Sequence, residues 1–157
     1  WTRPDRTGRR YAPARVGAGR VDAARATRTS VLAYVTRPAA AVSASFGVVP
    51  AKVTRSKVTR TRTLVVRNTG SKAVKVRLSY DAVNPAAGVG YSVSPASLTV
   101  RPRSTGRAVV RMTVAPKKLR HTIDKTMAKH QMTLPRQFVS DASGRVGWAG
   151  LGVRIED

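Results

Sequence analysis

Apolar and polar residues alternate through residues 58–80 in two runs that an Asn-Thr-Gly sequence separates. In the second run the apolar positions fall on one face of a strand and the polar positions on the other, which is the period of two expected of a half-buried strand. The apolar face carries Val74, Val76, Leu78 and Tyr80, and the opposite face carries Lys75, Arg77 and Ser79. The two runs predict two antiparallel strands with one side against a core.

Further strands follow the same rhythm along the chain. They are expected at residues 42–46, 58–67, 73–80, 91–93, 97–100 and 107–114, with turn-forming residues between them. Short strands at close spacing are typical of a sandwich, and the lack of helical segments between them disfavours a parallel α/β sheet. The predicted fold class is therefore all-β, an antiparallel fibronectin III/immunoglobulin-like β-sandwich preceded by a short helix and an extended N-terminal arm.

The two ends of the chain follow other patterns. Residues 1–20 are rich in Arg, Pro and Gly and predict an extended arm, whereas residues 21–34 begin with alanine-rich helical spacing and predict a short helix. Residues 115–135 lack alternation and predict a long surface loop with a helical turn around 124–130. Residues 137–148 predict a hairpin, in which Phe138 and Val139 face Val146 and Trp148. A last strand is expected where Leu151, Val153 and Ile155 alternate.

The charge of the chain is its most extreme property. The formal net charge is +23, with 22 arginines and eight lysines among 157 residues. Such a charge favours non-specific binding of polyanions, but specific nucleic-acid recognition also requires a clustered patch with a reading motif or stacking aromatic residues. With only eight aromatic residues and no such motif, charge alone does not define a function.

Several classes of chemistry find little support. The chain has no cysteine, which excludes disulfides and thiolate metal sites, and no apolar run of the roughly 20 residues that a spanning helix needs. A triad could be composed on paper from His121 or His130, Asp124 or Asp141, and Ser140 or Ser143, but no nucleophile motif surrounds either serine. The histidines are expected to be surface loop residues, so the sequence predicts no catalytic, metal or cofactor-binding residue and no cofactor.

One segment carries a family resemblance. Residues 15–25, RVGAGRVDAAR, resemble the close of a bacterial subtilisin-like serine protease domain, on Gly17, Gly19, Val21, Asp22 and Ala23. The following region is similar to the fibronectin type III-like domain that trails the catalytic domain in many secreted members of this subtilase family. This second similarity rests on Ser45-Phe46-Gly47, residues 60–67, Asn68-Thr69-Gly70 and Val93-Ser94-Pro95.

The resemblance implies a division of the chain and a function. Residues 1–36 would be the remnant of the peptidase domain, and residues 37–157 the sandwich, with a glycine-rich end for which truncation stays open. The family's serine lies in a Gly-Thr-Ser-Met-Ala segment that is absent here, so the chain as it stands should not hydrolyse peptides. The expected role is a secreted accessory module for stability or substrate presentation, although the chain carries no signal peptide. Its expected partners are an upstream catalytic domain and the protein substrate of that domain.

The alternative hypothesis is a basic sandwich that binds nucleic acid or an anionic cell-wall polymer through residues 52–62 and 101–120. Its candidate anion contacts are Arg60, Arg62, Lys75, Arg77, Arg101 and Arg103. The first two share a strand face with Val58 and Leu64, so they are also interpreted as edge charges that prevent sheets from pairing edge to edge.

Overall fold

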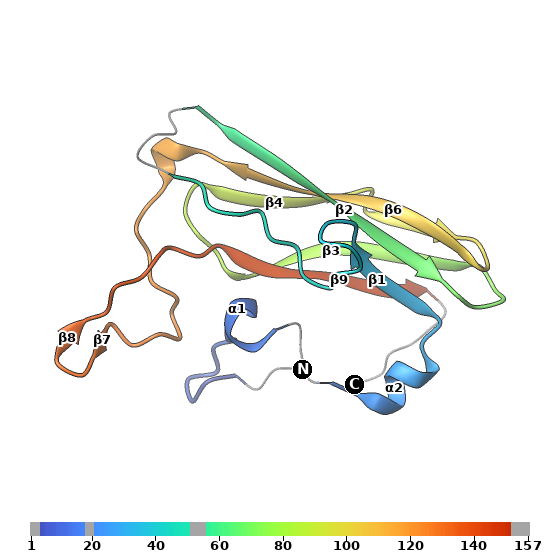
Figure 1. Ribbon diagram of the computed structural model, residues 1–157, viewed down its shortest axis with the longest axis horizontal. Helices are drawn as coiled ribbons and strands as arrows, with labels where there is room; N and C mark the ends of the chain where they lie inside the picture. The colour runs from blue at the N-terminus through green and yellow to red at the C-terminus, as the bar shows by residue number, and fades with distance from the viewer. Residues whose placement is uncertain (1–3, 18–20, 51–55, 152–157) are drawn as a thin grey trace.

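Two antiparallel β-sheets face each other in the computed structural model, which describes residues 4–17, 21–50 and 56–151 (Figure 1). Sheet A contains, in order across the sheet, β1 (Val31–Val35), β2 (Val58–Asn68), β6 (Ser104–Val114) and β4 (Val89–Ser94). Sheet B contains β5 (Ser97–Val100), β3 (Val74–Asn84) and β9 (Ser143–Leu151). The prediction of an all-β antiparallel sandwich is confirmed. The order of sheet A corresponds to the A-B-E-D order of immunoglobulin constant-type sheets when β5, which belongs to sheet B, is left out of the lettering.

Short elements complete the chain outside the two sheets. They are α1 (Pro13–Val16), α2 (Ala23–Arg28), the 3-10 helix η1 (Pro116–Lys118), and a small hairpin of β7 (His130–Gln131) and β8 (Leu134–Pro135). The long loop expected at 115–135 therefore holds η1 and this hairpin, and its predicted helical turn is a turn closed by the Met127 N–H and the Asp124 carbonyl. Among the described residues, no helix has the length and apolar character needed to cross a membrane.

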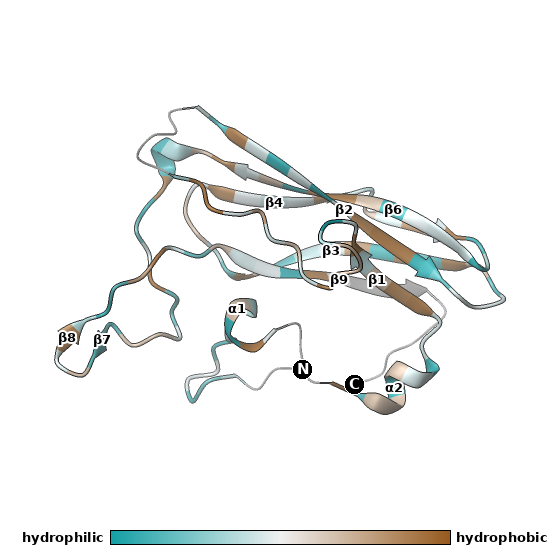
Figure 2. Cartoon of the chain, viewed as in Figure 1, coloured by the Kyte–Doolittle hydropathy of each residue, from teal (hydrophilic) through white to brown (hydrophobic). Residues whose placement is uncertain are grey.

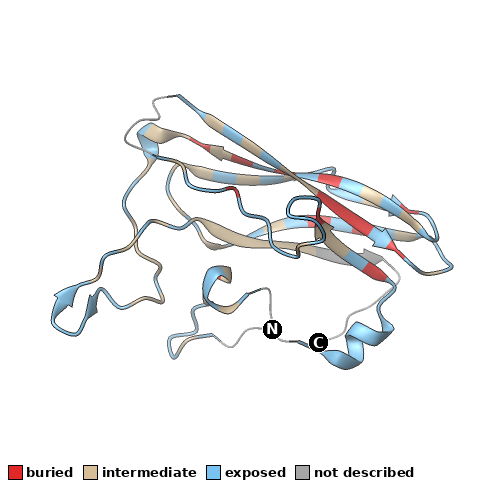
Figure 3. Cartoon of the chain, viewed as in Figure 1, coloured by how far each residue is buried: buried red, intermediate tan, exposed pale blue. Residues whose placement is uncertain are grey.

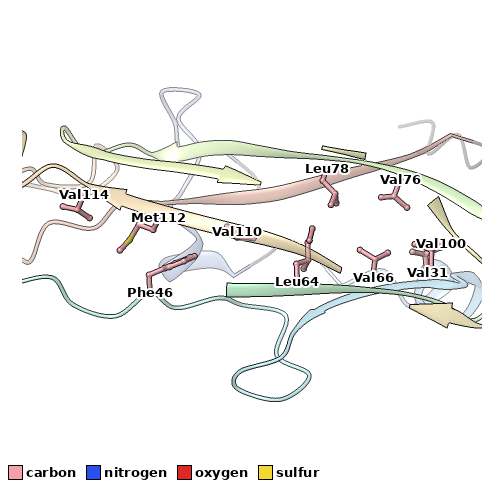
Figure 4. Packing of buried hydrophobic residues seen from close by; sticks show 11 residues of the cluster. Val31, Phe46, Leu64, Val66, Val76, Leu78, Val100, Val110, Met112 and Val114 are labelled. Carbon is pink, nitrogen blue, oxygen red and sulfur yellow. The ribbon is translucent and has the colours of Figure 1, made fainter. Parts of the chain in front are cut away.

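The core lies between the sheets and is built from the alternating strand positions (Figure 4). On β6, Ala108, Val110, Met112 and Val114 are buried while the residues between them are more exposed, as the pattern predicted. Figure 2 shows the same alternation of apolar and polar residues along the strands. The buried cluster is completed by Val31, Phe46, Leu64, Val66, Val76, Leu78 and Val100.

The strands β2 and β3 are both present, but they belong to different sheets. β2 pairs with β1 and β6, whereas β3 pairs with β5 and β9. The Asn-Thr-Gly sequence is therefore an arch over the end of the core, not a hairpin turn. Asn68 organises it: its side-chain amide donates to the carbonyls of Lys72 (2.7 Å), Val100 and Arg101 (3.2 Å each), and its Oδ1 accepts the Gly70 N–H at 2.9 Å. Asn68 is only 1% exposed.

Three predicted elements differ from the structure. The chain forms strand β1 at Val31–Val35, so the sandwich begins before the expected boundary at 36/37. The strand predicted at 42–46 is not formed; only an isolated bridge joins Ala41 to Val35, and Phe46 reaches the core from irregular backbone that turns at Gly47, whose φ is 73°.

The hairpin predicted at 137–148 is also wrong. Residues 136–142 are not a strand, and β9 pairs with β3, with Val146 opposite Tyr80. Alternation at Val146 correctly indicated a strand, but the strand with which it pairs lies more than sixty residues away along the chain. Leu151 ends β9, and the expected positions Val153 and Ile155 lie outside the described residues.

Candidate functional site

The six predicted anion contacts do not gather on one face of the sandwich. Lys75 and Arg77 are exposed on the outer side of sheet B, whereas Arg101 and Arg103 are exposed in the turn between β5 and β6. The backbone N–H of Arg103 donates to the Gly70 carbonyl at 3.2 Å, which ties this turn to the Asn68 arch. These four cations therefore occupy two separate surfaces.

Arg60 and Arg62 have a structural role instead. Both lie in the inward phase of β2 and are partly buried. Arg60 Nη1 donates to the Phe46 carbonyl, and Arg62 Nε donates to the Ser45 carbonyl at 2.8 Å. The Arg62 guanidinium also lies 5.3 Å from the centre of the Phe46 ring. The two arginines thus hold the irregular segment that delivers Phe46 to the core, because they satisfy carbonyls that no strand partner meets.

A different set of arginines is brought together on the outer face of sheet A. Arg67 on β2 and Arg107 and Arg111 on β6 are all exposed. Arg67 stands opposite Thr105, so Arg107 is its diagonal neighbour, at the roughly 7–8 Å that such pairs have. Arg111 lies four residues further along β6, about 13 Å at the rise of a strand. We call these three residues the arginine face.

The surroundings of the arginine face mix polar residues with the exposed apolar residues Leu32, opposite Arg67, and Val109, between Arg107 and Arg111, and carry no negative charge on these strands. None of the four strands of sheet A contains an acidic residue. Hydroxyl side chains flank the arginines on the same outer phase of the strands: Thr59, Thr61, Thr63, Thr105, Thr113, Ser92 and Ser94. The sequence analysis missed this set. Its signal was present, because Arg107 and Arg111 alternate with the core residues of β6.

The N-terminal residues are not a free arm. Residues 5–17, which we call the docked arm, fold into a turn and α1 and are tied to the rest of the chain by three arginines. Arg10 forms a two-bond ion pair with Asp81 on β3, Arg9 donates to the Lys125 carbonyl at 3.1 Å, and Arg15 donates to the Thr126 carbonyl at 2.9 Å. Ala12 within this arm is only 2% exposed.

Electrostatics support this docking. The hydrogen bonds from the Arg10 guanidinium hold the pKa of Asp81 below its usual value, and the carboxylate raises the pKa of Arg10 in turn. At the start of the docked arm, the Thr7 hydroxyl and the Arg9 N–H donate to the Asp5 carboxylate and lower its pKa. Both acids are therefore stabilised in their charged forms.

Three of the residues that carry the subtilase resemblance, Gly17, Asp22 and Ala23, lie at helix ends. Gly17, with φ 65°, ends α1, and its N–H donates to the Pro13 carbonyl at 2.7 Å. Asp22 begins α2, where its Oδ1 accepts the Arg25 N–H at 2.9 Å. Val21 is 85% exposed, Ala23 is the first residue of α2, and Gly19 lies outside the described residues. Asp22 is thus engaged as a helix cap.

The histidines and serines do not form a triad within the described residues. His121 stacks on Phe138, with ring centres 4.2 Å apart, and its Nε2 lies 3.1 Å from the Phe138 carbonyl. Ser143 instead donates to Asp141 at 2.7 Å, and the Ser140 hydroxyl accepts the Thr122 N–H. His130 is exposed on β7, and Asp124 accepts from Thr126. Over the same residues, no group of three or more acidic, histidine or cysteine side chains is placed to hold a metal ion.

Two tyrosines lie at the open end of the sandwich. Tyr80 and Tyr91 stack with ring centres 4.8 Å apart, and the Tyr91 hydroxyl donates to the Ala142 carbonyl at 2.8 Å. Burial is the main cause that raises the pKa of Tyr80 to about 12, and burial also raises the pKa of Tyr91. They line a cavity of about 200 Å³ whose wall holds no charged side chain. The cavity therefore offers no group for acid or base chemistry near neutral pH.

Comparisons with known proteins add little. No family model matches the chain, and no curated protein sequence matches it. A crystal structure of a FixG-related protein from Vibrio parahaemolyticus is similar over 57% of this chain and 68% of that chain, at 18% identity and a TM-score of 0.33. At this TM-score the similarity supports no functional statement, so the function is argued from the residues themselves.

Proposed function

We propose that this chain is the non-catalytic C-terminal part of a secreted subtilisin-like serine endopeptidase. In this proposal the sandwich is an accessory module that stabilises a preceding catalytic domain or presents substrate to it. The resemblance of residues 15–25 to the end of such a domain suggests the family, and two features of the N-terminal region support the proposal.

The observation that carries the proposal is the exposure of α2. This helix has six residues, is capped by Asp22, and contains no buried residue (Figure 3). Isolated helices this short are marginal in water, and helices in proteins owe most of their stability to packing of one face. Val21, directly before the helix cap, is 85% exposed. A neighbouring domain that covers Val21 and the alanines of α2 would supply the missing packing.

The docked arm supports a fixed attachment. Arg10, Arg9 and Arg15 tie it to β3 and to the loop at residues 125–126. Chain that is held at several points transmits the position of one domain to the next, whereas a linker rich in small polar residues would not. A catalytic domain connected through this arm would therefore keep a defined orientation to the sandwich.

The proposal is tested with the coding sequence that precedes Trp1, expressed together with this chain. The longer polypeptide should hydrolyse casein and lose this activity on treatment with a serine-directed inhibitor, while residues 1–157 alone should show no hydrolysis. An upstream sequence without the aspartate, histidine and serine segments of a subtilisin-like domain would contradict the proposal.

A paired substitution tests the covering of α2. Val21→Asp should change the unfolding free energy of residues 1–157 by less than about 0.5 kcal/mol, because the side chain is exposed. In the longer polypeptide it should shorten the half-life of activity on heating, because a charge would enter an apolar contact. Val42→Asp is the matched control, since Val42 is 78% exposed and does not belong to α2 or its cap. Equal half-lives for the two variants would refute the contact.

A further inference from the structure

The arginine face has the charge and chemistry of a surface that holds a linear anion. Arg67, Arg107 and Arg111 are exposed on one side of sheet A, and the four strands contain no acidic residue to neutralise them. The outer side of sheet B differs, because Asp81 lies there and the docked arm is tied to it. The outer side of sheet B also carries Lys75 and Arg77, so the two faces differ in this acidic residue and its docked arm, not in the presence of cations.

The position of Val65 indicates that the arginine face is ordered. Val65 points to the outer side of sheet A and is not part of the core cluster, yet it is only 5% exposed. Its partners in the sheet are Tyr34 on β1 and Arg107 on β6. Flanking side chains must cover Val65, and the register makes the aliphatic stem of Arg107, together with Tyr34, a candidate for this cover while its guanidinium stays in water. A stem fixed in this way loses less entropy when the guanidinium binds an anion.

The side chains of this face select the kind of anion. A guanidinium presents a planar fork of donors that fits phosphate oxygens, and the threonine and serine hydroxyls around it add further donors. Binding of bare nucleic-acid strands relies on aromatic platforms on which bases stack. Tyr34 is the one aromatic side chain on the outer phase of these four strands, and it is partly buried beside Val65. The face therefore suits a phosphodiester chain that carries no bases.

We propose that the arginine face binds an anionic polymer of the poly(glycerol phosphate) type, through its phosphates and without reading its other groups. This inference is independent of the peptidase proposal, because it rests on sheet A alone. Three phosphate contacts predict a defined salt dependence: each neutralised phosphate of a flexible strand contributes roughly −0.7 to the slope of log affinity against log salt, or about −2 for three contacts.

The test measures binding of residues 1–157 to poly(glycerol phosphate) between about 50 and 200 mM salt. The triple variant R67A/R107A/R111A should reduce the slope by about 2, so that over this fourfold range of salt the wild type loses roughly 20-fold more affinity than the variant. The control K72A/K75A/R77A removes the same charge from the region of β3, where all three side chains are exposed, and should keep the wild-type slope.

Two further measurements test the arginine face if the alanine triple variant unfolds. R67K/R107K/R111K keeps the charges and the stem over Val65, so it should keep the slope and lose only a few-fold in affinity, because lysine lacks the bidentate fork. Equal losses in the two alanine triples would show that net charge alone acts, and would overturn the proposal. Absence of wild-type binding at low salt would overturn it too, as would binding of an oligothymidylate of equal charge more than tenfold more tightly.

Discussion

Asn68 offers the sharpest test of the fold, because one side chain ties the arch between the two sheets. Its amide and carbonyl groups contact the backbone of Gly70, Lys72, Val100 and Arg101, and the residue is 1% exposed. Replacement by alanine leaves the Gly70 N–H and these carbonyl oxygens with fewer partners, at a site where the contact to Val100 is buried and the others are partly buried.

The expected loss can be estimated from these contacts. A buried polar group that loses its partner costs roughly 1–3 kcal/mol, so two such groups give about 3 kcal/mol for Asn68→Ala. For a chain of this length, each kcal/mol lowers the midpoint of thermal unfolding by roughly 2–4 °C, which predicts a fall of roughly 6–12 °C. Asn68→Asp should cost more at neutral pH, because a buried carboxylate would face three carbonyl oxygens.

Chemical denaturation of the purified chain measures these differences. Asn84→Ala is the control, since the Asn84 amide donates to the Asp141 carbonyl at the surface, and it should cost less than about 1 kcal/mol. The destabilisation caused by Asn68→Asp should shrink as the pH falls. Burial raises the folded-state pKa of the new carboxyl above its unfolded value of about 3.9. The variant should therefore be most stable below pH ~3.9, where the carboxyl is neutral in both states, and should lose stability as the pH rises through the folded-state pKa. A cost for Asn68→Ala within about 0.5 kcal/mol of zero would refute the role of the arch.

Two further predictions concern the end of the sandwich where Tyr80 lies. A Cβ at Gly144 would collide with the Asp81 carbonyl oxygen and the Tyr80 hydroxyl, so Gly144→Ala should destabilise the chain by roughly 3 kcal/mol in chemical denaturation. A Cβ at Gly147 would have its nearest neighbour, the Ser79 hydroxyl oxygen, 3.6 Å away, so Gly147→Ala should be nearly neutral in the same assay. Equal costs for the two glycines would contradict the close packing. Because the pKa of Tyr80 is raised to about 12, its contribution to stability is complete below pH ~10 and is lost as the pH rises through about 12, which phenol absorbance during alkaline titration can follow. A tyrosine population that titrates entirely near pH ~10 in the folded protein would contradict this prediction.

Most of the strands could be predicted from the sequence, but their partners could not. The alternation along β6 identified its buried residues, but Arg107 and Arg111 in the opposite phase were missed, because an exposed phase alone does not distinguish a binding surface from a solvated one. The same alternation at residues 42–46 did not produce a strand, because Arg60 and Arg62 bind the backbone of that segment and Phe46 alone enters the core. An alternation with a period of two indicates that one face of a strand is buried, but it does not show which strand pairs with it.

The folding of the docked arm could not be predicted from the local sequence pattern either. Residues 1–20 have the composition of an open arm, but within them residues 5–17 are held by groups that lie far away along the chain. Arg10 meets Asp81 after 71 residues, and Arg15 meets Thr126 after 111. Gly17 and Asp22, by contrast, act locally at the ends of α1 and α2, so their roles at these helix ends depend only on nearby sequence.

The docked arm is folded onto the sandwich as a fixed link. Backbone hydrogen exchange of residues 1–157 tests this attachment most directly. Peptides from residues 5–17 should be protected in the wild type and lose protection in Asp81→Ala, while β2 and β6 stay protected, because an exposed ion pair contributes at most about 1 kcal/mol to global stability. Asp22→Ala, which removes the Arg25 ion pair at α2, should leave residues 5–17 unchanged. Exchange of residues 5–17 at the rate of an unfolded peptide in the wild type would contradict the account.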